Sequence, residues 1–414
     1  MQLKELTSET FDNFAINFSP NSPYQTSFYG DTMVKEGYKP MYFGLVDNDK
    51  LVAATMILVK ADGKFKYGYV PRGFLVDYSN TLLVNEFSKQ LKRYLGMNNI
   101  VALKVSPTII KNIFNSNYEI ITKNDNYSYI FNNLMTNGYN HLGYNMLFES
   151  YKPRYEAVID LNSDVYTLFN NMSKEYRTKV RSAEDNGIRI HKGSDVNLET
   201  LYNQVKNKYP RGLEYFKDLY DNFNKKGLIE LYYAKLEPNV YLKKNQVEYE
   251  KDDIASYQAN ESVLRSAMKS DFVLDRKMKA DKALMESKAK LSDAVNLMNK
   301  YPDGIIVATV LVIKMNDTVH VIMDSFDRKY SNFNAKHLII WKLIEKFATE
   351  GYKHFNLGGI VGRVEKTNKY YGLNSYKLGF GARIYEYAGD FEFITNKPLY
   401  LIYKNSFMFK KEKK

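Results

Sequence analysis

Residues 239–301 read NVYLKKNQVEYEKDDIASYQANESVLRSAMKSDFVLDRKMKADKALMESKAKLSDAVNLMNKY and contain neither proline nor glycine. Their wealth of lysine, acidic residues, alanine and methionine favours a helix. Pro238 before the stretch and Pro302-Asp303-Gly304 after it are residues that end helices. A single helix of this length would span roughly 95 Å. A fold back near Ser270-Asp271 predicts two antiparallel helices of about 45 Å each instead.

The second half of this stretch repeats apolar residues every seven positions, at Leu284, Leu291 and Met298, with Val295 beside them. A heptad seam of this kind packs on a partner helix. The candidate partners in the first half are Val247, Ile254, Tyr257, Leu264 and Met268. We expect Asp271 to cap the second helix. The sequence therefore predicts an inserted helical hairpin, and a surface insertion without a function is the alternative.

The flanks of the hairpin are rich in Tyr, Phe, Val and Ile and predict a mixed α/β body. Strands are expected at 41–60 (a hairpin), 65–70 and 100–105, with a helix at 81–96. A second series of strands is expected at 155–161, 188–191, 229–236, 304–314, 318–323 and 355–357. Helices are expected among them at 164–186, 198–223 and 335–349. Because the order β-β-α-β occurs twice, we expect two α/β units.

The charge of the chain lies mostly in this body. The formal net charge is +12, and residues 239–301 hold twelve Lys/Arg and ten Asp/Glu, which leaves 12 − 2 = +10 for the rest. A basic body indicates a polyanionic partner such as nucleic acid, a nucleotide or a phospholipid headgroup. A lysine-rich proteome is the alternative explanation.

Several classes of site are excluded or disfavoured by what the sequence lacks. The chain has no cysteine, so it has no disulfides and no thiolate chemistry. The five histidines are scattered, and neither a G-x-S-x-G string nor a Walker loop is present. The N-terminal residues lack a signal pattern and the apolar run 304–313 is too short to span a bilayer, so we expect a cytoplasmic protein. Gly358 and Gly359 follow a strand without a convincing helix directly after them, which favours a tight turn at a site wall over a pyrophosphate loop.

Three strings are candidates for chemistry. Lys174, Arg177 and Arg181 share one helix face and suit phosphates, although a solvated face is the alternative. Arg211 beside Tyr215 can hold a phosphate while the ring stacks on a base or sugar. Lys377, between aromatic neighbours and close to glycines, can place a cation in a partly dry pocket. An amphipathic strand is the alternative for that last string.

Short strings along nearly the whole chain resemble the Fem family, the aminoacyltransferases of the peptidoglycan interpeptide bridge, and most closely its FemA/FemB type. The strings are Tyr24-Gln25-Thr26, Glu36-Gly37-Tyr38, Pro71-Arg72-Gly73, Val76-Asp77-Tyr78, Arg177-Thr178-Lys179-Val180, Asn186-Gly187, Phe355-Asn356, Gly358-Gly359, Tyr376-Lys377, Tyr387-Ala388-Gly389-Asp390-Phe391 and Asn396-Lys397-Pro398. None is specific alone, but their order together with the hairpin is.

The resemblance implies two acetyltransferase-like (GNAT-like) subdomains, 1–150 and 151–238 with 302–395, a coiled-coil arm at 239–301, and a segment 396–414 that returns to the first subdomain. It implies transfer of glycine, serine or alanine from aminoacyl-tRNA to the stem-peptide or bridge amine of lipid II or UDP-MurNAc-pentapeptide. No cofactor beyond this co-substrate and no metal are expected. The family would also allow three kinds of partner: the inner face of the membrane, a second copy of the chain in a homo-oligomer, or related bridge-forming enzymes.

The resemblance also suggests roles for residues. Lys377 and Tyr376 match the catalytic string, with the lysine near the reacting ester. Arg211, Tyr215, Tyr330, Arg72, Gly358 and Gly359 are the substrate-binding candidates. Lys174, Arg177, Lys179 and Arg181 are the tRNA-binding candidates. Relatives often have Asp-Pro where this chain has Ser106-Pro107, and small residues where it has Ser325-Phe326-Asp327, so contacts at both places are in doubt.

The chemistry needs no covalent nucleophile because an aminoacyl ester is already activated. Positioning the amine and stabilising the oxyanion supply the rate, and the general base stays open. The rival functions are an aminoacyl-tRNA–protein transferase, an acetyl-CoA acyltransferase and a non-catalytic, nucleic-acid-binding coiled-coil protein.

Overall fold

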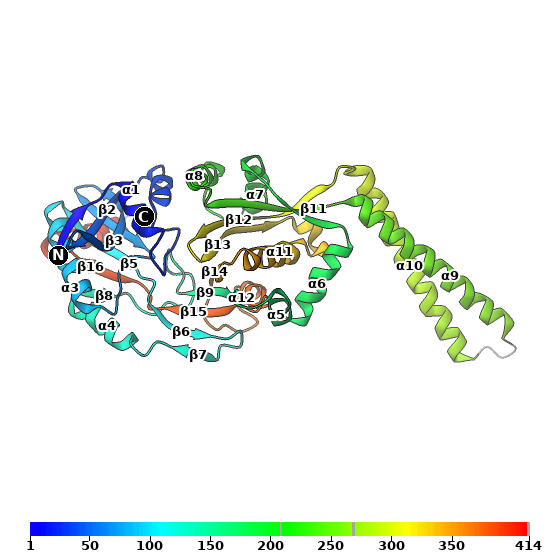
Figure 1. Cartoon of the computed structure of the whole chain (residues 1–414). Helices are drawn as coiled ribbons and strands as arrows, with labels where there is room; N and C mark the ends of the chain where they lie inside the picture. The colour runs from blue at the N-terminus through cyan, green and yellow to red at the C-terminus, as the bar shows by residue number, and fades with distance from the viewer. Residues whose placement is uncertain (208, 267–269, 412–414) are drawn as a thin grey trace.

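Two mixed β-sheets form the body of the protein in a computed structural model that describes residues 1–207, 209–266 and 270–411 (Figure 1). The seven-stranded sheet has the order β1 (Gln2–Glu5), β2 (Lys39–Asp47), β3 (Lys50–Asp62), β4 (Phe65–Pro71), β5 (Ile100–Ser106), β16 (Phe391–Ile394), β8 (Tyr139–His141). The nine-stranded sheet has the order β10 (Ile188–Lys192), β11 (Ile229–Leu236), β12 (Ile305–Met315), β13 (Thr318–Phe326), β14 (His354–Ile360), β9 (Tyr155–Asp160), β15 (Arg383–Tyr387), β6 (Ile110–Phe114), β7 (Ile120–Lys123).

Helices cover these sheets and connect their strands. Those of the first half are α1 (Ser8–Ala15), α2 (Ser27–Val34), α3 (Thr81–Met97), α4 (Tyr127–Thr136), α5 (Val165–Asn171) and α6 (Lys174–Asp185). Those of the second half are α7 (Leu198–Val205), α8 (Leu213–Asn224), α9 (Pro238–Arg265), α10 (Asp271–Lys300), α11 (Ala335–Thr349), α12 (Tyr371–Leu378) and α13 (Lys397–Lys411). Two 3-10 segments, η1 (Asp195–Asn197) and η2 (Arg328–Phe333), complete the elements.

The two sheets repeat one topology, as the order of predicted elements indicated. In each, antiparallel strands lead through a helix to a strand that pairs in parallel: β4, α3 and β5 in one, β13, α11 and β14 in the other. The parallel pairs differ in length, however. β4 and β5 stay paired from Lys66 to Pro71, whereas β13 and β14 pair only from Thr318 to His320. Beyond that point the two strands separate, and the sheet opens beside Gly358.

A shared hydrophobic cluster joins the two sheets. It contains side chains of α1, α2 and β3 from the N-terminal part and of α7, α8, β11 and β12 from the later part. The rings of Phe28 on α2 and Phe223 on α8 lie 5.5 Å apart within it. Opposite this cluster, α5, α6, α11 and α12 cover the other face of the nine-stranded sheet. The strands β9, β14 and β15 therefore carry helices on one face and meet the N-terminal part on the other.

The chain crosses between the sheets at other places than the expected subdomain boundaries. β6 and β7, within residues 1–150, extend the nine-stranded sheet beside β15. β16, before residue 395, lies in the seven-stranded sheet between β5 and β8. α13 packs on this same sheet, where Tyr400 contacts Val101 and Ala102. A strand belongs to the sheet in which it pairs, whatever its place in the chain. Subdomains defined as continuous stretches of sequence therefore do not match the two sheets.

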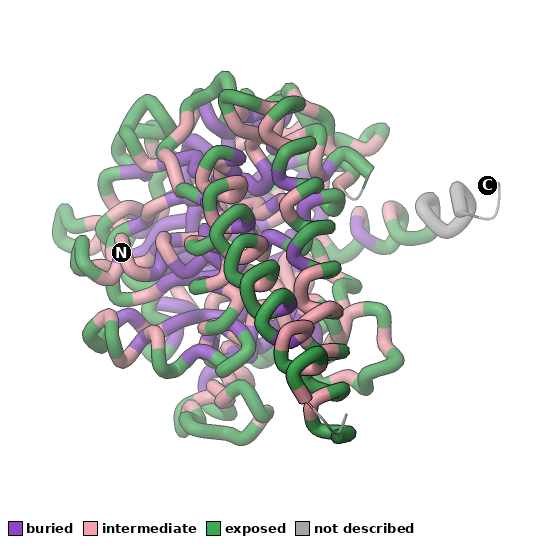
Figure 2. Tube along the Cα trace, turned by 90° about the vertical axis from the view of Figure 1, so that its right-hand side faces the viewer, coloured by how far each residue is buried: buried purple, intermediate pink, exposed green. Residues whose placement is uncertain are grey.

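Two long helices, α9 (Pro238–Arg265) and α10 (Asp271–Lys300), project from the body (Figure 1). Ser256 Oγ donates to Asp281 Oδ1 at 2.7 Å and Lys290 pairs with Glu248 at 3.1 Å, so the helices run antiparallel. Figure 2 shows that buried residues concentrate in the body while the arm is mostly exposed or half-buried. Asp271 does not cap α10: the N-cap position belongs to Ser270, without a side-chain hydrogen bond.

The seam between α9 and α10 agrees with the prediction on α10, where Leu284, Leu291 and Met298 are half-buried, and differs from it on α9. The residues buried there are small or polar: Asn245, Ser256 and Ala259 on α9, and Ser287 and Ala294 on α10. The predicted partners on α9 point to solvent, with Val247 66%, Ile254 58%, Tyr257 68% and Leu264 79% exposed, and Val295 on α10 is 41% exposed. Met268 lies outside the described residues. Small side chains let two helices approach closely, so the face of α9 that carries them packs on α10, and the larger apolar residues of α9 face solvent.

Two local expectations also changed. The helical region 164–186 breaks into α5 and α6 at Met172-Ser173, where Ser173 Oγ accepts from Tyr176 N at 3.2 Å and caps α6. The string around Lys377 lies on helix α12, so its alternative interpretation as a strand is wrong. Among the described residues, no helix is long and apolar enough to cross a membrane.

Candidate active site

Glu156 is the centre of a polar cluster on the nine-stranded sheet. It lies on β9, where Tyr155, Ala157 and Ile159 point into the core beneath α11, so Glu156 points to the opposite face. Glu156 Oε1 accepts a hydrogen bond from Arg72 at 2.6 Å. Its Oε2 accepts from Asn356 Nδ2 at 2.8 Å and from the Tyr387 hydroxyl at 3.1 Å. Burial alone would raise the pKa of Glu156, but Arg72 and the hydrogen bond from Asn356 hold that pKa below its ordinary value.

Arg72 approaches this cluster from the N-terminal part of the protein. It follows β4 with a φ of +52° and is 4% exposed. The guanidinium also donates to the Pro153 carbonyl at 2.7 Å and lies 4.2 Å from the centroid of the Tyr387 ring. The Arg72–Glu156 ion pair therefore joins the two sheets at the wall of the cleft between them.

A group of cations and aromatic rings continues the cleft from Arg72. Arg211 pairs with Glu36 at 3.1 Å and lies 4.2 Å from the centroid of the Tyr215 ring. Lys152 Nζ lies 2.7 Å from the Tyr24 ring centroid, close enough to Arg72, Arg211 and Glu156 for their charges to act on it. Burial, together with both arginines, brings the pKa of Lys152 well below its ordinary value, against the opposing effect of Glu156.

A cavity of about 240 Å³ lies beside Glu156, and Lys152 is not among its lining residues. Tyr24, Arg72, Glu156, His320 and Asn356 are among its lining residues. Burial, with the repulsion of Arg72, lowers the pKa of His320 to about 4 despite the carboxylate of Glu156. His320 is therefore neutral near pH 7. Its Nε2 has no hydrogen-bond partner in the part of the chain that the structure describes.

Lys377 lies where β13 and β14 separate. Its Nζ donates to the Gly359 carbonyl at 2.9 Å, and a Cβ on Gly358 would lie 3.6 Å from this Nζ. Gly358 has a φ of +79°, a conformation that favours glycine. Burial lowers the pKa of Lys377, whereas Asp324 and Glu156 oppose that shift. The ammonium thus lies close to the Glu156 cluster although α12 belongs to the other face of the sheet.

A second cavity, of about 520 Å³, lies on that other face between α6, α11 and α12. Its lining includes Tyr176, Lys179, Phe326, Lys336 and Tyr376. Lys336 Nζ lies 4.3 Å from the centroid of the Tyr376 ring, and the Tyr376 hydroxyl donates to the Lys336 carbonyl at 3.2 Å. Tyr376 thus belongs to this cavity while its neighbour Lys377 reaches the opening in the sheet.

The structure brings together most of the substrate-binding candidates and separates others. Arg72, Arg211 and Tyr215 meet around Lys152, and Gly358 and Gly359 meet Lys377. Tyr330 does not join them: it is 5% exposed in the core, near Phe333 and near Tyr301 at the end of the arm. A sequence position cannot show whether a tyrosine ring faces a site or the core.

The basic residues of α6 have unequal surroundings. Arg177 donates to the carbonyls of Asn170 and Met172 at 2.7 and 2.8 Å, which satisfies the end of α5. Lys179 pairs with Glu175. Arg181 is exposed with its guanidinium 5.3 Å from the Phe169 ring centroid, and Lys174 is exposed. Arg177 therefore has a structural role here, and Lys174 and Arg181 are the accessible cations.

Sequence reasoning missed Glu156 and Lys152. A glutamate inside the apolar run of β9 is a signal that could have drawn attention to Glu156, because buried carboxylates need partners. Lys152 lies in a linker and carries no comparable signal. Ser106, at the place where relatives often have Asp, is buried and donates to Asp390 Oδ1 at 2.7 Å, and Lys104 pairs with Asp390 at 2.8 Å.

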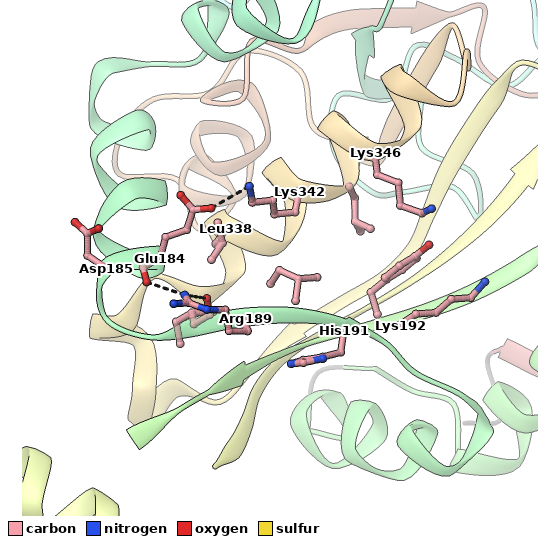
Figure 3. Close-up of a pocket in the computed structure, with 12 residues that line it drawn as sticks. Glu184, Asp185, Arg189, His191, Lys192, Leu338, Lys342 and Lys346 are labelled. Carbon is pink, nitrogen blue, oxygen red and sulfur yellow. Dashed lines mark hydrogen bonds and ion pairs between the residues drawn. The ribbon is translucent and has the colours of Figure 1, made fainter. Parts of the chain in front are cut away.

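A third, open groove lies away from this site, beside the edge strand β10 and between α6 and α11 (Figure 3). Its volume is about 610 Å³. Its cations are paired: Lys342 with Glu184 at 2.9 Å and Lys192 with Glu230 at 2.8 Å. Within the described residues no group of His, Asp and Glu side chains could hold a metal ion.

Comparisons with known proteins agree on one family. A profile of the FemAB family matches residues 6–406. The chain is 23% identical to a lipid II:glycine glycyltransferase of Staphylococcus saprophyticus subsp. saprophyticus, covering 98% of this chain and 96% of that protein. It is 25% identical to the aminoacyltransferase FemA of Staphylococcus epidermidis, covering 98% of each. The crystal structure of FemX superposes with a TM-score of 0.77 at 20% identity, covering 97% of this chain and 99% of FemX, and so shares the fold.

Proposed function

Because the chain belongs to the FemAB family, we propose that it is an aminoacyltransferase that extends the peptidoglycan interpeptide bridge. In this proposal an amino acid passes from aminoacyl-tRNA to an amine of lipid II or of its UDP-linked precursor. Glycine is the proposed amino acid, supported by the name of a relative, a lipid II:glycine glycyltransferase. The observation that carries the proposal is Lys377 Nζ at an opening in the sheet, with the Glu156 cavity on one face and the α6–α11–α12 cavity on the other.

The donor is proposed to enter from the α6–α11–α12 side. The cavity there combines the rings of Tyr176 and Tyr376 with the cations Lys179 and Lys336. Aromatic rings stack on single-stranded bases and cations track the phosphates, which suits the 3′ end of a tRNA. Lys174 and Arg181 on α6 would extend this basic surface toward the tRNA body.

The acceptor is proposed to occupy the opposite cleft. Arg72 and Tyr24 line its cavity, and Arg211 with the ring of Tyr215 lies near Tyr24. Guanidinium groups next to aromatic rings recognise phosphates and sugars. Two acetyltransferase-like units would then meet around the acceptor, and the repeated β4–α3–β5 and β13–α11–β14 topology supports that interpretation.

The proposed reaction takes place beside Lys377. The acceptor amine attacks the ester carbonyl, and the Lys377 ammonium stabilises the oxyanion that develops. The intermediate then collapses, the amide bond remains, and the 3′ hydroxyl of the tRNA leaves with a proton. Because Lys377 already donates to the Gly359 carbonyl, its position is held before substrate binds.

Mass spectrometry of reactions with charged tRNA tests this proposal. The wild-type protein is incubated with glycyl-tRNA and lipid II, and in parallel with seryl-tRNA, alanyl-tRNA or a peptide that presents a free N-terminus. We expect glycine on lipid II. Transfer to the peptide but not to lipid II would establish the rival aminoacyl-tRNA–protein transferase instead. Absence of transfer with every acceptor would contradict the proposal.

A further inference from the structure

A fourth cavity, of about 710 Å³, lies between helix α7 and the edge of the nine-stranded sheet where β12 begins and β13 ends. Its lining is largely polar: Asn203, Gln204 and Asn207 supply amides, and Arg328 supplies a guanidinium. Phe326, the last residue of β13, lines this cavity and also the α6–α11–α12 cavity. The amide-lined cavity therefore adjoins the proposed donor side at the end of β13.

The ammonium of Lys336 lies close to the aromatic rings on both sides of this junction. Its Nζ is 4.3 Å from the centroid of the Tyr376 ring and 4.8 Å from the centroid of the Phe326 ring. Single-stranded nucleic acids bind where bases stack on successive rings and cations contact the phosphates between them. Phe326 stands where relatives tend to have small residues, so the second ring distinguishes this chain from them.

The polar groups of the fourth cavity suit hydrogen bonds with the edge of a base. Gln204 Oε1 accepts from the buried Ser325 Oγ at 2.7 Å, which fixes the amide. Its Nε2 then remains a donor that has no acceptor within the described residues. Asp327 Oδ1 accepts from Lys329 N at 2.9 Å, and its Oδ2 remains an acceptor. Arg328 is exposed and pairs with no carboxylate in the part of the chain that the structure describes.

We propose that this cavity binds the cytidine that precedes the 3′-terminal adenosine of the donor tRNA. The inference rests on the proposed function and deepens it. The cytosine ring stacks on Phe326, while Lys336 and Arg328 contact the phosphates on its two sides. The pairing edge of cytosine presents one amino donor and two acceptors, which match the Asp327 carboxylate and the Gln204 amide. In uracil a carbonyl oxygen replaces the amino group, and the carboxylate of Asp327 would repel it.

Binding of short donor analogues tests this subsite without requiring transfer. The probes carry glycine on the 3′ position through an amide in place of the ester, and they are the adenosine, the CpA dinucleotide and the UpA dinucleotide. By isothermal titration calorimetry, the full-length wild type should bind CpA about fivefold or more tighter than the adenosine. It should also bind CpA about fivefold or more tighter than UpA, because only cytosine matches the hydrogen-bonding groups.

Two substitutions at Phe326 separate stacking from packing. Phe326 also packs against the core beneath α11, so leucine is chosen because it keeps an apolar side chain there. Phe326→Leu should abolish the advantage of CpA over the adenosine and leave the affinity for the adenosine unchanged. Phe326→Tyr should retain the advantage, because a ring remains. Phe272→Leu is the matched control, since Phe272 is 76% exposed on α10, and it should leave all three affinities unchanged.

A substitution at Gln204 tests the reading of the base. Gln204→Glu keeps the shape of the side chain but replaces the NH2 donor by an oxygen. This oxygen accepts from the N3–H of uracil and repels the N3 lone pair of cytosine. The preference should therefore move from CpA toward UpA, measured as the ratio of the two affinities.

Four results would overturn the cytidine subsite. They are equal wild-type affinities for CpA and the adenosine, equal wild-type affinities for CpA and UpA, an unchanged CpA advantage in Phe326→Leu, and absence of wild-type binding to every probe. The proposed function is tested separately by transfer from charged tRNA. If the wild type prefers CpA as expected but transfers no amino acid, the subsite stands and the proposed function is wrong. If the wild type transfers an amino acid but shows no preference for CpA, the proposed function stands and the subsite is wrong.

Discussion

Glu156→Gln tests whether the buried ion pair between the two sheets is a principal stabilising contact of the cleft. The side chains of Arg72 and Glu156 are 4% and 10% exposed, so solvent cannot replace a missing partner. Removing one partner of a buried pair costs about 3–5 kcal/mol. In glutamine one carboxylate oxygen is replaced by an NH2 group, which cannot accept a hydrogen bond. If this group takes the place of Oε2, it faces two other donors, Asn356 Nδ2 and the Tyr387 hydroxyl. We therefore expect the free energy of unfolding to fall by about 3–5 kcal/mol.

The assay is urea denaturation of Glu156→Gln, Arg72→Met and the double variant at pH 7. Removing both charges costs less than leaving one unpaired. The double variant should therefore be more stable than the sum of the two single effects predicts. Additive effects, or a loss below about 1 kcal/mol in Glu156→Gln, would refute the reasoning. Arg72 and hydrogen bonds hold the pKa of Glu156 below its ordinary value. Its contribution is thus present above about pH 4.3 and is lost as pH falls through the folded-state pKa, so the acid sensitivity of Glu156→Gln should be weaker there.

Other changes give separable outcomes. Lys377→Met should lower single-turnover transfer by about a hundredfold or more while donor affinity measured separately stays close to wild type; near-normal transfer at saturating donor would contradict the oxyanion role. Lys152→Met should raise the free energy of unfolding at pH 7 by about 1 kcal/mol. Because the pKa of Lys152 is lowered in the folded protein, the unfolded chain binds more protons, and the stability of the wild type should rise with pH up to about 10.4. Urea denaturation at several pH values should show that the free energy of unfolding rises less steeply with pH in the variant. Lys174→Ala and Arg181→Ala should each reduce the salt dependence of tRNA binding by about one unit of slope, whereas Arg177→Ala should cost about 1 kcal/mol of stability because its carbonyl partners lose a donor. Ala294→Leu, in the arm seam, should destabilise the arm by about 1–3 kcal/mol, measured as lost helix signal on heating, and Leu264→Ala should change little.

The sequence by itself determined the local elements and their order. Pro238 and Pro302 delimit the two arm helices within one or two residues, because proline restricts its neighbours whatever the tertiary structure. Period-two and period-3.6 patterns located β2 to β5, α3, β11 to β13 and α11 for the same reason. The short sequence strings, taken together and in their order, also indicated the family without any knowledge of tertiary contacts, since a common ancestor preserves their order.

Tertiary structure alone decided which side chains meet. Arg72 and Glu156 are far apart in the chain and touch only because the two sheets pack through α2 and α8. The opening beside Gly358 arises where β13 and β14 lose their register, which no local pattern encodes. The packed face of α9 was settled by close approach at Ala259 and Ser256, although larger apolar residues lay on the same helix. Lys152 acquired its environment from Tyr24, Arg72 and Arg211, three residues on separate segments, because electrostatic surroundings depend on distance in space and not on distance along the chain.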